Sequence, residues 1–464
     1  MTAVVLESAF KQLSLLRNEE ISALELAREH LGQIERLNPA LNALIEVDPE
    51  RVLEQARSLE RHTGPLAGLP VTVKSSIAVE GYRCELGSRI YEGRASSHDA
   101  VVVARLRAAG ANILGTTNCP ELLMAYETDN LLYGRTCNPW SIDHTAGGSS
   151  GGEAAAIASG MSAAGLGSDS GGSVREPAHF TGICALKPTP GRIPRAGHEP
   201  ACVGPFSILG AVGPMARTIA DVKLLFGVLA GHDDKDPASA PVALRRPAQL
   251  DVKQVSIGYL EDDGLVPVTA ETRQAVRDAM NALKRQGFNV TAVRPTWLEA
   301  ARKLWWTFFV RCGAMFYGPV IRGRHELLSP IFCEFLSFSE ELPALSGIEL
   351  LEAWAECDLL RARILEEMAA TPILLTPVCS VPAFRHSERR WKVEGGEVGY
   401  LDAMRFTQWF NLLGAPAAVV PVGRSAEGLP IGVQIAGRPY EDELVLEVAA
   451  RIESEFGYVA PPLS

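Results

Sequence analysis

The sequence lacks the patterns that mark several common classes of protein. Its nine cysteines are an odd number with no CxxC pair, which favours free thiols in a reducing compartment over a disulfide framework or a zinc site. Its nine histidines include no HExxH motif, so we expect no catalytic metal. No apolar run is long enough to span a membrane, and the N-terminus has no basic start followed by an apolar stretch. We therefore expect a cytoplasmic protein without a membrane span.

A basic face is also lacking. The formal charge is -11 and is spread along the chain, which argues against nucleic-acid binding because phosphate contacts need clustered Lys and Arg. With 47% hydrophobic and 21% charged residues among 464, the chain has ample material for a buried core. We expect a soluble globular protein, and the charge says little about whether it acts on a small neutral molecule.

Hydrophobic periodicity predicts helices that alternate with strands. Apolar residues three or four apart indicate a helix over 21–34 that stops before Asn38 and Pro39. Further helices are expected at 100–109, 270–286 and 441–456, and strands at 69–74, 111–114, 255–259, around Val290, at 373–376 and at 417–421. No repeat and no Pro/Ser-rich hinge interrupts this alternation, so we expect one α/β domain over residues 1–464.

Two glycine-serine loops stand out in composition. Residues 147–152 read GGSSGG and lead into an alanine-rich helix, and residues 171–173 read GGS. Paired glycines let the backbone turn sharply and bring N–H groups close to a bound atom, which is how a main-chain oxyanion hole is built. A lone GGS would be only a flexible turn. Nucleotide binding is the weaker interpretation, because neither Gly-Lys-Ser/Thr nor GxGxxG is present.

These loops and the residues between them resemble the amidase signature. The matching stretches, which fall in the family's order, are Lys74, 115–118, 138–140, 147–152, 167–178, 182–189, 376–377 and 428–434. The resemblance covers nearly the whole chain. It implies a mixed β-sheet flanked by α-helices on both faces, with a catalytic core over residues 65–195 and no cofactor.

By that resemblance Ser173 is the nucleophile, Ser149 is a serine next to a cis peptide bond, and Lys74 is the base. A serine hydroxyl needs a neighbour to take its proton, and an ordinary lysine is protonated at neutral pH. Burial disfavours the ammonium form and can provide a neutral amine that receives the proton through Ser149. The same path can return a proton to the leaving nitrogen.

The resemblance also implies supporting roles. The main-chain N–H groups of Ser170, Gly171, Gly172 and Ser173 are the expected oxyanion donors. Three further residues, Ser150, Asp169 and Arg175, are expected to support the loops, and a contact from Arg175 to a substrate carboxylate is the less favoured alternative.

The sequence departs from the usual family pattern at three places. Ser75 and Ser76 follow Lys74 where Asp-Asn is common, Thr116 replaces a usual lysine, and Glu176 follows Arg175 where many members carry an uncharged residue. None of these departures removes Lys74, Ser149 or Ser173. They do prevent the substrate preference of other family members from being transferred to this chain.

Aromatic residues are concentrated in the segment 295–345. Large apolar side chains are usually core, and we expect that of most of them. The sharper hypothesis is a mobile cap over the substrate pocket that selects bulky apolar or aromatic substrates.

Other serine-hydrolase patterns fit less well. Residues 147–151 satisfy GxSxG, the nucleophile elbow of α/β-hydrolases, but that motif needs a preceding strand, and 137–144 is not expected to be one. Residues 8–11 match SxxK without a Lys-Thr-Gly partner. His144 and His179 are expected to be polar neighbours, because a lysine relay needs no histidine.

We therefore expect a hydrolase that forms an acyl-enzyme on Ser173 and cleaves amides, anilides, and also carbamates (urethanes) or esters. The alternative is an ammonia-delivering component of the amidotransferase A type, which needs a partner. As a hydrolase the chain is expected to act as a monomer or homodimer.

Overall fold

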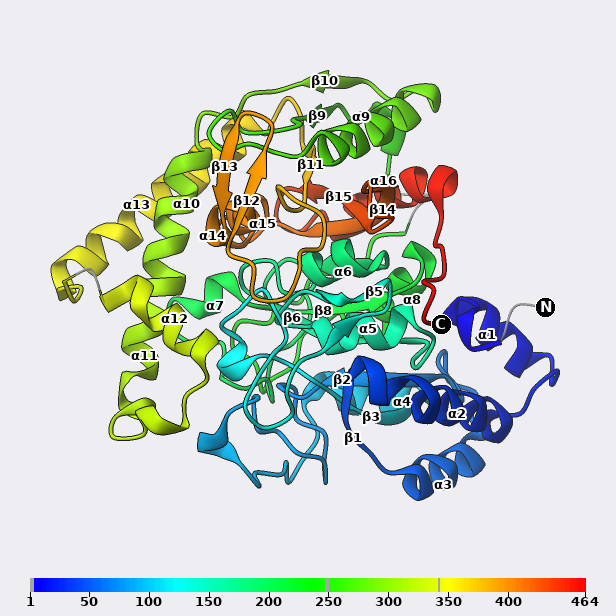
Figure 1. The fold of residues 1–464 in the computed structure, drawn as a ribbon. Helices are drawn as coiled ribbons and strands as arrows, with labels where there is room; N and C mark the ends of the chain where they lie inside the picture. The colour runs from blue at the N-terminus through cyan, green and yellow to red at the C-terminus, as the bar shows by residue number, and fades with distance from the viewer. Residues whose placement is uncertain (1–3, 247–249, 341–342) are drawn as a thin grey trace.

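The computed structural model describes residues 4–246, 250–340 and 343–464. Within these ranges eleven strands form one sheet in the order β1-β3-β2-β6-β8-β7-β14-β15-β11-β9-β10. Their bounds, in that order, are Leu44–Val47, Asn112–Thr117, Pro70–Lys74, Ala164–Asp169, Ala211–Ala216, Cys184–Lys187, Ala417–Arg424, Pro430–Gly437, Ile373–Pro377, Ile257–Tyr259 and Val290–Ala292. In Figure 1 the sheet extends from β1 near the bottom to β10 at the top.

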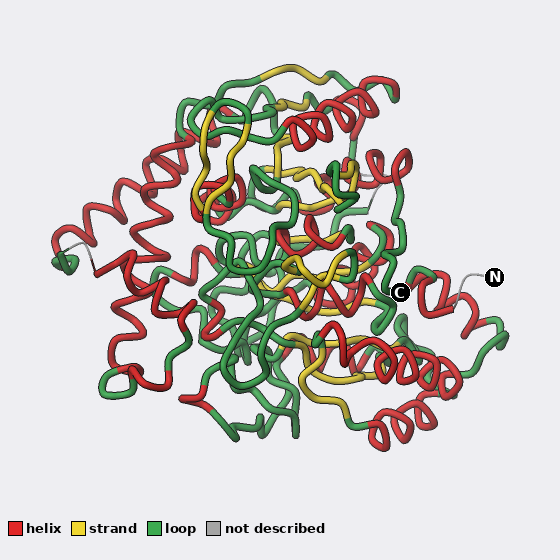
Figure 2. The backbone as a smooth tube through the Cα atoms, in the orientation of Figure 1, coloured by secondary structure: helices red, strands yellow, loops and turns green. Residues whose placement is uncertain are grey.

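The sheet is mixed. Strand β2 pairs in parallel with both β3 and β6, and β9 pairs in parallel with β10 and β11. The strands between these two groups, from β6 through β8, β7, β14 and β15 to β11, pair antiparallel. Figure 2 shows the strands stacked through the middle of the molecule with helices around them.

Helices cover both faces of the sheet. Successive side chains of a strand point to opposite faces, and on β7 Ala185 packs with α5 and α6 while Leu186 belongs to the core that includes α4, α8, α9 and α16. The helices are α1 (Ala9–Arg17), α2 (Ala23–Leu41), α3 (Pro49–Leu59), α4 (Val101–Ala108), α5 (Gly151–Ala158), α6 (Arg175–Thr181), α7 (Phe206–Leu209), α8 (Ile219–Leu229), α9 (Ala270–Arg285), α10 (Leu298–Trp306), α11 (Cys312–Ile321), α12 (Pro330–Glu340), α13 (Gly347–Glu367), α14 (Tyr400–Ala403), α15 (Arg405–Leu413) and α16 (Asp442–Phe456). The predicted α/β class and mixed sheet are confirmed.

The aromatic segment forms a second core beside the sheet. Helices α10 to α13 gather along the left side in Figure 1, and α10 and α13 pack on α15. Trp297, Trp305, Phe308 and Phe332 are almost fully buried there, whereas Phe316 is 41% exposed. Most of these aromatic side chains are therefore core, as expected.

Most predicted elements lie within a few residues of their observed bounds, but the end predicted for the first long helix is wrong. Helix α2 continues through Asn38 and Pro39 to Leu41. A proline in the last turn removes one backbone donor without ending the helix. The N-terminus of α2 is fixed by a capping box, in which Ser22 and Glu25 each accept a hydrogen bond from the other's backbone N–H.

The expectation that 137–144 is not a strand is also wrong. Strands β4 (Cys137–Asn138) and β5 (Ser141–Thr145) form a small antiparallel sheet there, separate from the central sheet. The strands are short and surround Pro139, which hides their pattern in the sequence. A second small sheet is formed by β12 (Arg390–Val393) and β13 (Gly396–Gly399).

A search for membrane spans among the described residues finds no helix with the length and apolar character needed to cross a bilayer. The nine cysteines all lie within the described ranges and form no disulfide there, as the absence of paired motifs predicts.

Candidate active site

Lys74 is the last residue of β2, a strand that is buried along its whole length between β3 and β6. Its Nζ lies 2.6 Å from the Oγ of Ser149, 3.0 Å from the Oγ of Ser150 and 3.2 Å from the Oγ of Ser168. Burial lowers the pKa of Lys74 to about 8, although nearby acidic groups oppose this shift. At pH 7 roughly a tenth of the amine is therefore neutral, far more than for a lysine in water.

Ser149 lies on the loop between β5 and α5. The peptide bond between Gly148 and Ser149 is cis, so the cis bond expected next to this serine is present. Gly148 cannot be replaced without movement, because a Cβ there would lie 2.6 Å from the backbone N and O of Glu127. The tight loop turns the Ser149 hydroxyl toward Lys74.

Ser173 lies on the loop that joins β6 to α6 and is 9% exposed. The N–H of Ser150 donates to its carbonyl oxygen over 3.1 Å, which ties the two glycine-serine loops together. Ser173 lines the same cavity as Ser149, but within the described residues no hydrogen bond joins the two hydroxyls. The structure thus brings together the three residues that the resemblance names.

The amides expected to form the oxyanion hole differ in their partners. The N–H of Gly172 donates to Asp169 Oδ1 over 2.8 Å, so it is already engaged. In the part of the chain that the structure describes, the N–H groups of Ser170, Gly171 and Ser173 have no protein acceptor. The expected set of donors therefore narrows to these three.

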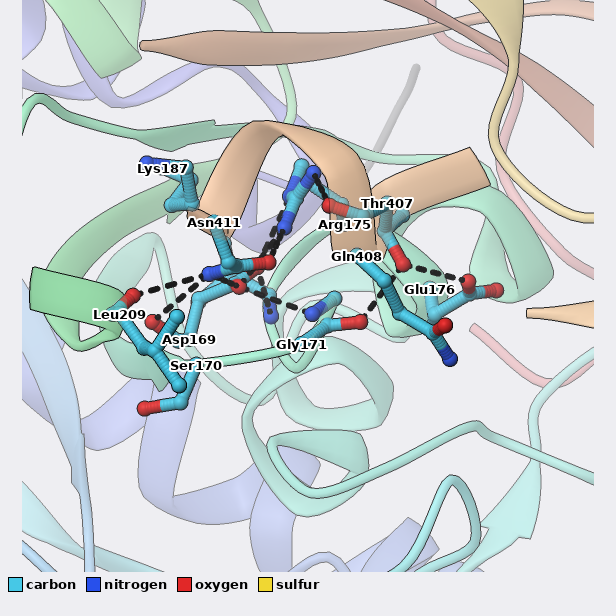
Figure 3. Close-up of polar contacts among 12 residues, drawn as sticks. Asp169, Ser170, Gly171, Arg175, Glu176, Lys187, Leu209, Thr407, Gln408 and Asn411 are labelled. Atoms are coloured by element: carbon cyan, nitrogen blue, oxygen red, sulfur yellow. Dashed lines mark hydrogen bonds and ion pairs between the residues drawn. The ribbon is translucent and has the colours of Figure 1, made fainter. Parts of the chain in front are cut away.

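A buried ion pair lies beneath the nucleophile loop. The guanidinium of Arg175 donates to both carboxylate oxygens of Asp169 over 2.9 and 3.0 Å, and both side chains are inaccessible to solvent (Figure 3). Burial opposes ionisation of Asp169, but Arg175 holds its pKa below the ordinary value. Arg175 also donates to the Thr407 carbonyl and to Gln434, so its donors face protein groups rather than a cavity. This favours the supporting role over contact with a substrate carboxylate.

Glu176, one of the departures from the family pattern, is fully buried beside this pair (Figure 3). Burial raises its pKa well above the ordinary value, which favours the protonated carboxyl. One oxygen lies 3.3 Å from the hydroxyl of Thr407, which in turn donates to the carbonyl of Gly171 over 2.6 Å. Glu176 is thus part of the support of the loop.

Ser173 lies where two cavities meet. The first, which we call the aromatic cavity, and the second, the serine cavity, are partly open to solvent and contain about 490 Å³ and 440 Å³ of space between atoms, solvent included. The aromatic cavity is lined mainly by Leu123, Met124, Tyr126, Ser173, Trp305, Phe309, Phe335, Phe338 and Tyr400. The serine cavity is lined by Ser149, Ser168, Ser170, Ser173, His198, Cys202 and Phe206, together with Phe309 and Tyr317. One apolar and one more polar cavity therefore open on the same hydroxyl.

Several neighbours of the site were not identified from the sequence. Ser168 contacts Lys74 and lies within a matching stretch, so its position was a usable signal. Tyr126 and Thr407 both donate to the carbonyl of Gly171, over 2.9 and 2.6 Å, yet they come from distant parts of the chain with no local pattern. Trp305 donates its indole N–H to the carbonyl of Ser170.

His144 and His179, the two histidines that the sequence places near the site, have the predicted structural roles. His179 is buried and its ring nitrogens bond to the main chain of Gly432 and Val381. His144 bonds to the hydroxyl of Ser141 over 2.9 Å. The two rings are thus occupied by these partners. Among the described residues no group of three His, Cys, Asp or Glu is placed to hold a metal.

Known proteins resemble this chain over nearly its whole length. A family model described as Amidase matches residues 25–446. The chain is 33% identical to an acylamidase of Rhodococcus erythropolis, over 96% of this chain and 95% of that protein. It is also 33% identical to the A-type subunit of the glutamyl-tRNA(Gln) amidotransferase of Synechococcus sp. (strain JA-2-3B'a(2-13)), over 97% of this chain and 92% of that protein. The solved structure of 6-aminohexanoate cyclic dimer hydrolase complexed with substrate matches with a TM-score of 0.88 and 28% identity, over 99% of each chain.

The chain belongs to the Amidase family. It is an amide-hydrolysing enzyme, which confirms the class that the motifs indicated.

Proposed function

We propose that the enzyme hydrolyses amides, anilides and carbamates, and also esters, through an acyl-enzyme on Ser173. The observation that carries the proposal is the 2.6 Å contact between the buried Nζ of Lys74 and the Oγ of Ser149, in a site that Ser173 shares. The neutral amine of Lys74 accepts the proton of Ser149, and Ser149 accepts the proton of Ser173 as its Oγ attacks the carbonyl carbon. The free N–H groups of Gly171 and Ser173 stabilise the oxyanion that forms.

The same groups then act in reverse. As the carbonyl–nitrogen bond breaks, Ser149 gives its proton to the leaving nitrogen and is reprotonated by the ammonium of Lys74. A water molecule then attacks the ester on Ser173, its proton passes to the relay, and the acid is released with the Ser173 hydroxyl restored. Each step balances without a cofactor.

The linings of the two cavities support one orientation of the substrate. The leaving nitrogen must lie near Ser149, which lines the serine cavity and not the aromatic cavity. The acyl group therefore occupies the aromatic cavity, whose walls suit an aryl or branched apolar group. We therefore propose that the core at 65–195 performs the chemistry and that the segment 295–345 forms a cap that selects the acyl group.

The test is replacement of Ser173. We expect Ser173→Ala to lose hydrolysis of a p-nitroanilide and labelling by a fluorophosphonate, while Ser337→Ala, a control on α12, keeps both. Mass spectrometry of the labelled wild-type protein should place the adduct on Ser173. Labelling that persists in Ser173→Ala would refute the assignment of the nucleophile.

A second candidate function is ammonia delivery to a partner, favoured by the similarity to the A-type subunit of an amidotransferase. Release of p-nitroaniline by the purified chain without ATP or partner would favour the stand-alone hydrolase.

We propose that the hydrolase is a cytoplasmic monomer or homodimer. Size-exclusion chromatography with light scattering would test the oligomeric state.

A further inference from the structure

Trp305 joins the aromatic cavity to the nucleophile loop. It lies near the end of α10, just before the π-helical turn η6 (Thr307–Arg311), and is only 1% exposed. Its indole N–H donates to the carbonyl oxygen of Ser170 over 2.9 Å. Its ring stacks on Phe309 with 4.7 Å between centroids and 13° between planes, and both rings line the aromatic cavity. One side chain thus contacts both the cavity and the backbone beside Ser173.

The hydrogen bond to Ser170 has a consequence for Gly171. The peptide bond between these residues is trans, so its C=O and N–H point in opposite directions within one plane. Holding the carbonyl of Ser170 therefore fixes the direction of the Gly171 N–H, which has no protein acceptor among the described residues. This N–H is a proposed oxyanion donor, and such donors act only when they are already aimed at the developing charge.

The next peptide group is held in the same way. Tyr126 and Thr407 donate to the carbonyl of Gly171, which fixes the N–H of Gly172 against Asp169. The Trp305 ring also packs directly on the loop, since a Cβ on Gly171 would lie 2.7 Å from its Cζ2. The loop is thus held by Trp305 of the aromatic segment and by Tyr126 and Thr407 from other parts of the chain.

We propose that Trp305 is a positioning residue that aims the Gly171 N–H at the oxyanion, in addition to forming a wall of the acyl cavity. The proposal rests on the proposed function of Ser173. It implies that the aromatic segment contributes to the rate of acylation as well as to substrate selection.

The variant Trp305→Phe separates the two roles, because phenylalanine keeps an aromatic ring and removes the donor. Loss of an oxyanion donor itself costs about 10²–10³ in kcat, so loss of its alignment should cost about tenfold. We expect kcat for a p-nitroanilide to fall about tenfold with KM changed less than about twofold, and fluorophosphonate labelling of Ser173 to slow in parallel. Trp306→Phe is the matched control, since Trp306 lines neither cavity and should leave both rates unchanged.

The opposite pattern would overturn the proposal. If Trp305→Phe raises KM or changes acyl selectivity while kcat and the labelling rate stay at wild-type values, Trp305 is only a wall. If Trp305→Phe does not fold, replacement of Trp305 by benzothienylalanine provides the second test, because it keeps the bicyclic ring and removes only the N–H that holds the Ser170 carbonyl. It should also lower kcat about tenfold, and an unchanged kcat there would overturn the proposal. Failure of the proposed function is distinguishable, because Ser173→Ala would then still be labelled.

Discussion

The glycine-serine centre and the aromatic segment differ in how they are built. The centre combines the end of strand β2 with the loops after β5 and β6, and its buried lysine lies within hydrogen-bonding distance of three hydroxyls. The aromatic segment is helical and lies beside the sheet; Trp305 donates to the nucleophile loop, and Phe309 lines both cavities with Ser173. The groups that make and break bonds thus lie at a strand end and on short loops, whereas the substrate-facing wall belongs to a helical segment that reaches these loops through Trp305.

The largest effect is expected from removing the amine of the centre. Lys74→Ala should lower kcat by about 10²–10⁴, because proton transfer by a placed base typically contributes that much. Steady-state hydrolysis of a p-nitroanilide measures it. Lys303→Ala, a lysine of α10 in the aromatic segment, serves as the control. If the kcat of Lys74→Ala lies within tenfold of the wild-type value, the centre does not have the proton-transfer role that distinguishes it from the aromatic segment.

A large loss of stability is expected from breaking the ion pair beneath the centre. Asp169→Asn leaves Arg175 buried without its counter-charge, which should lower the free energy of unfolding by about 3–5 kcal/mol. Chemical denaturation measures the change. Glu397→Gln breaks the exposed pair with Arg390 and should cost less than about 1 kcal/mol. Equal costs for both variants would contradict the structural role of Asp169.

A smaller and different effect is expected from the aromatic wall. Phe309→Ala should reduce the preference for aryl over small aliphatic acyl groups by about 10–200-fold, since apolar pocket contacts are worth about 1–3 kcal/mol. The measurement is the ratio of kcat/KM for a benzoyl and an acetyl anilide. Phe316→Ala, which removes a partly exposed ring outside both cavities, should keep the ratio. An unchanged ratio in Phe309→Ala would mean that the segment is plain core.

The two regions also differ in how far the sequence predicts them. The proposed triad and the residues proposed to support it, Ser150, Asp169 and Arg175, lie in short local motifs, and the strand that presents Lys74 shows regular alternation. The roles of Trp305, Tyr126 and Thr407 depend on contacts between segments far apart in the chain, for which one sequence gives no signal. The missed strands β4 and β5 were too short for a periodic pattern, and the end of α2 was misplaced because Pro39 is tolerated in its last turn.

The central claim is that a neutral amine at Lys74 drives attack by Ser173, and the pH dependence of acylation tests it most directly. The base must be deprotonated, so the rate of fluorophosphonate labelling should rise about tenfold per pH unit below the pKa of about 8 and level off above it. Burial also raises the pKa of Glu153 to about 8, and the variant Glu153→Gln separates the two groups. It should keep the tenfold slope but move the midpoint to lower pH, because the Glu153 carboxylate raises the pKa of Lys74. A labelling rate that rises in this way in the wild type and loses the dependence in Lys74→Ala is the predicted result. A rate independent of pH from about 6 to about 9, the range that brackets this pKa, would contradict the account.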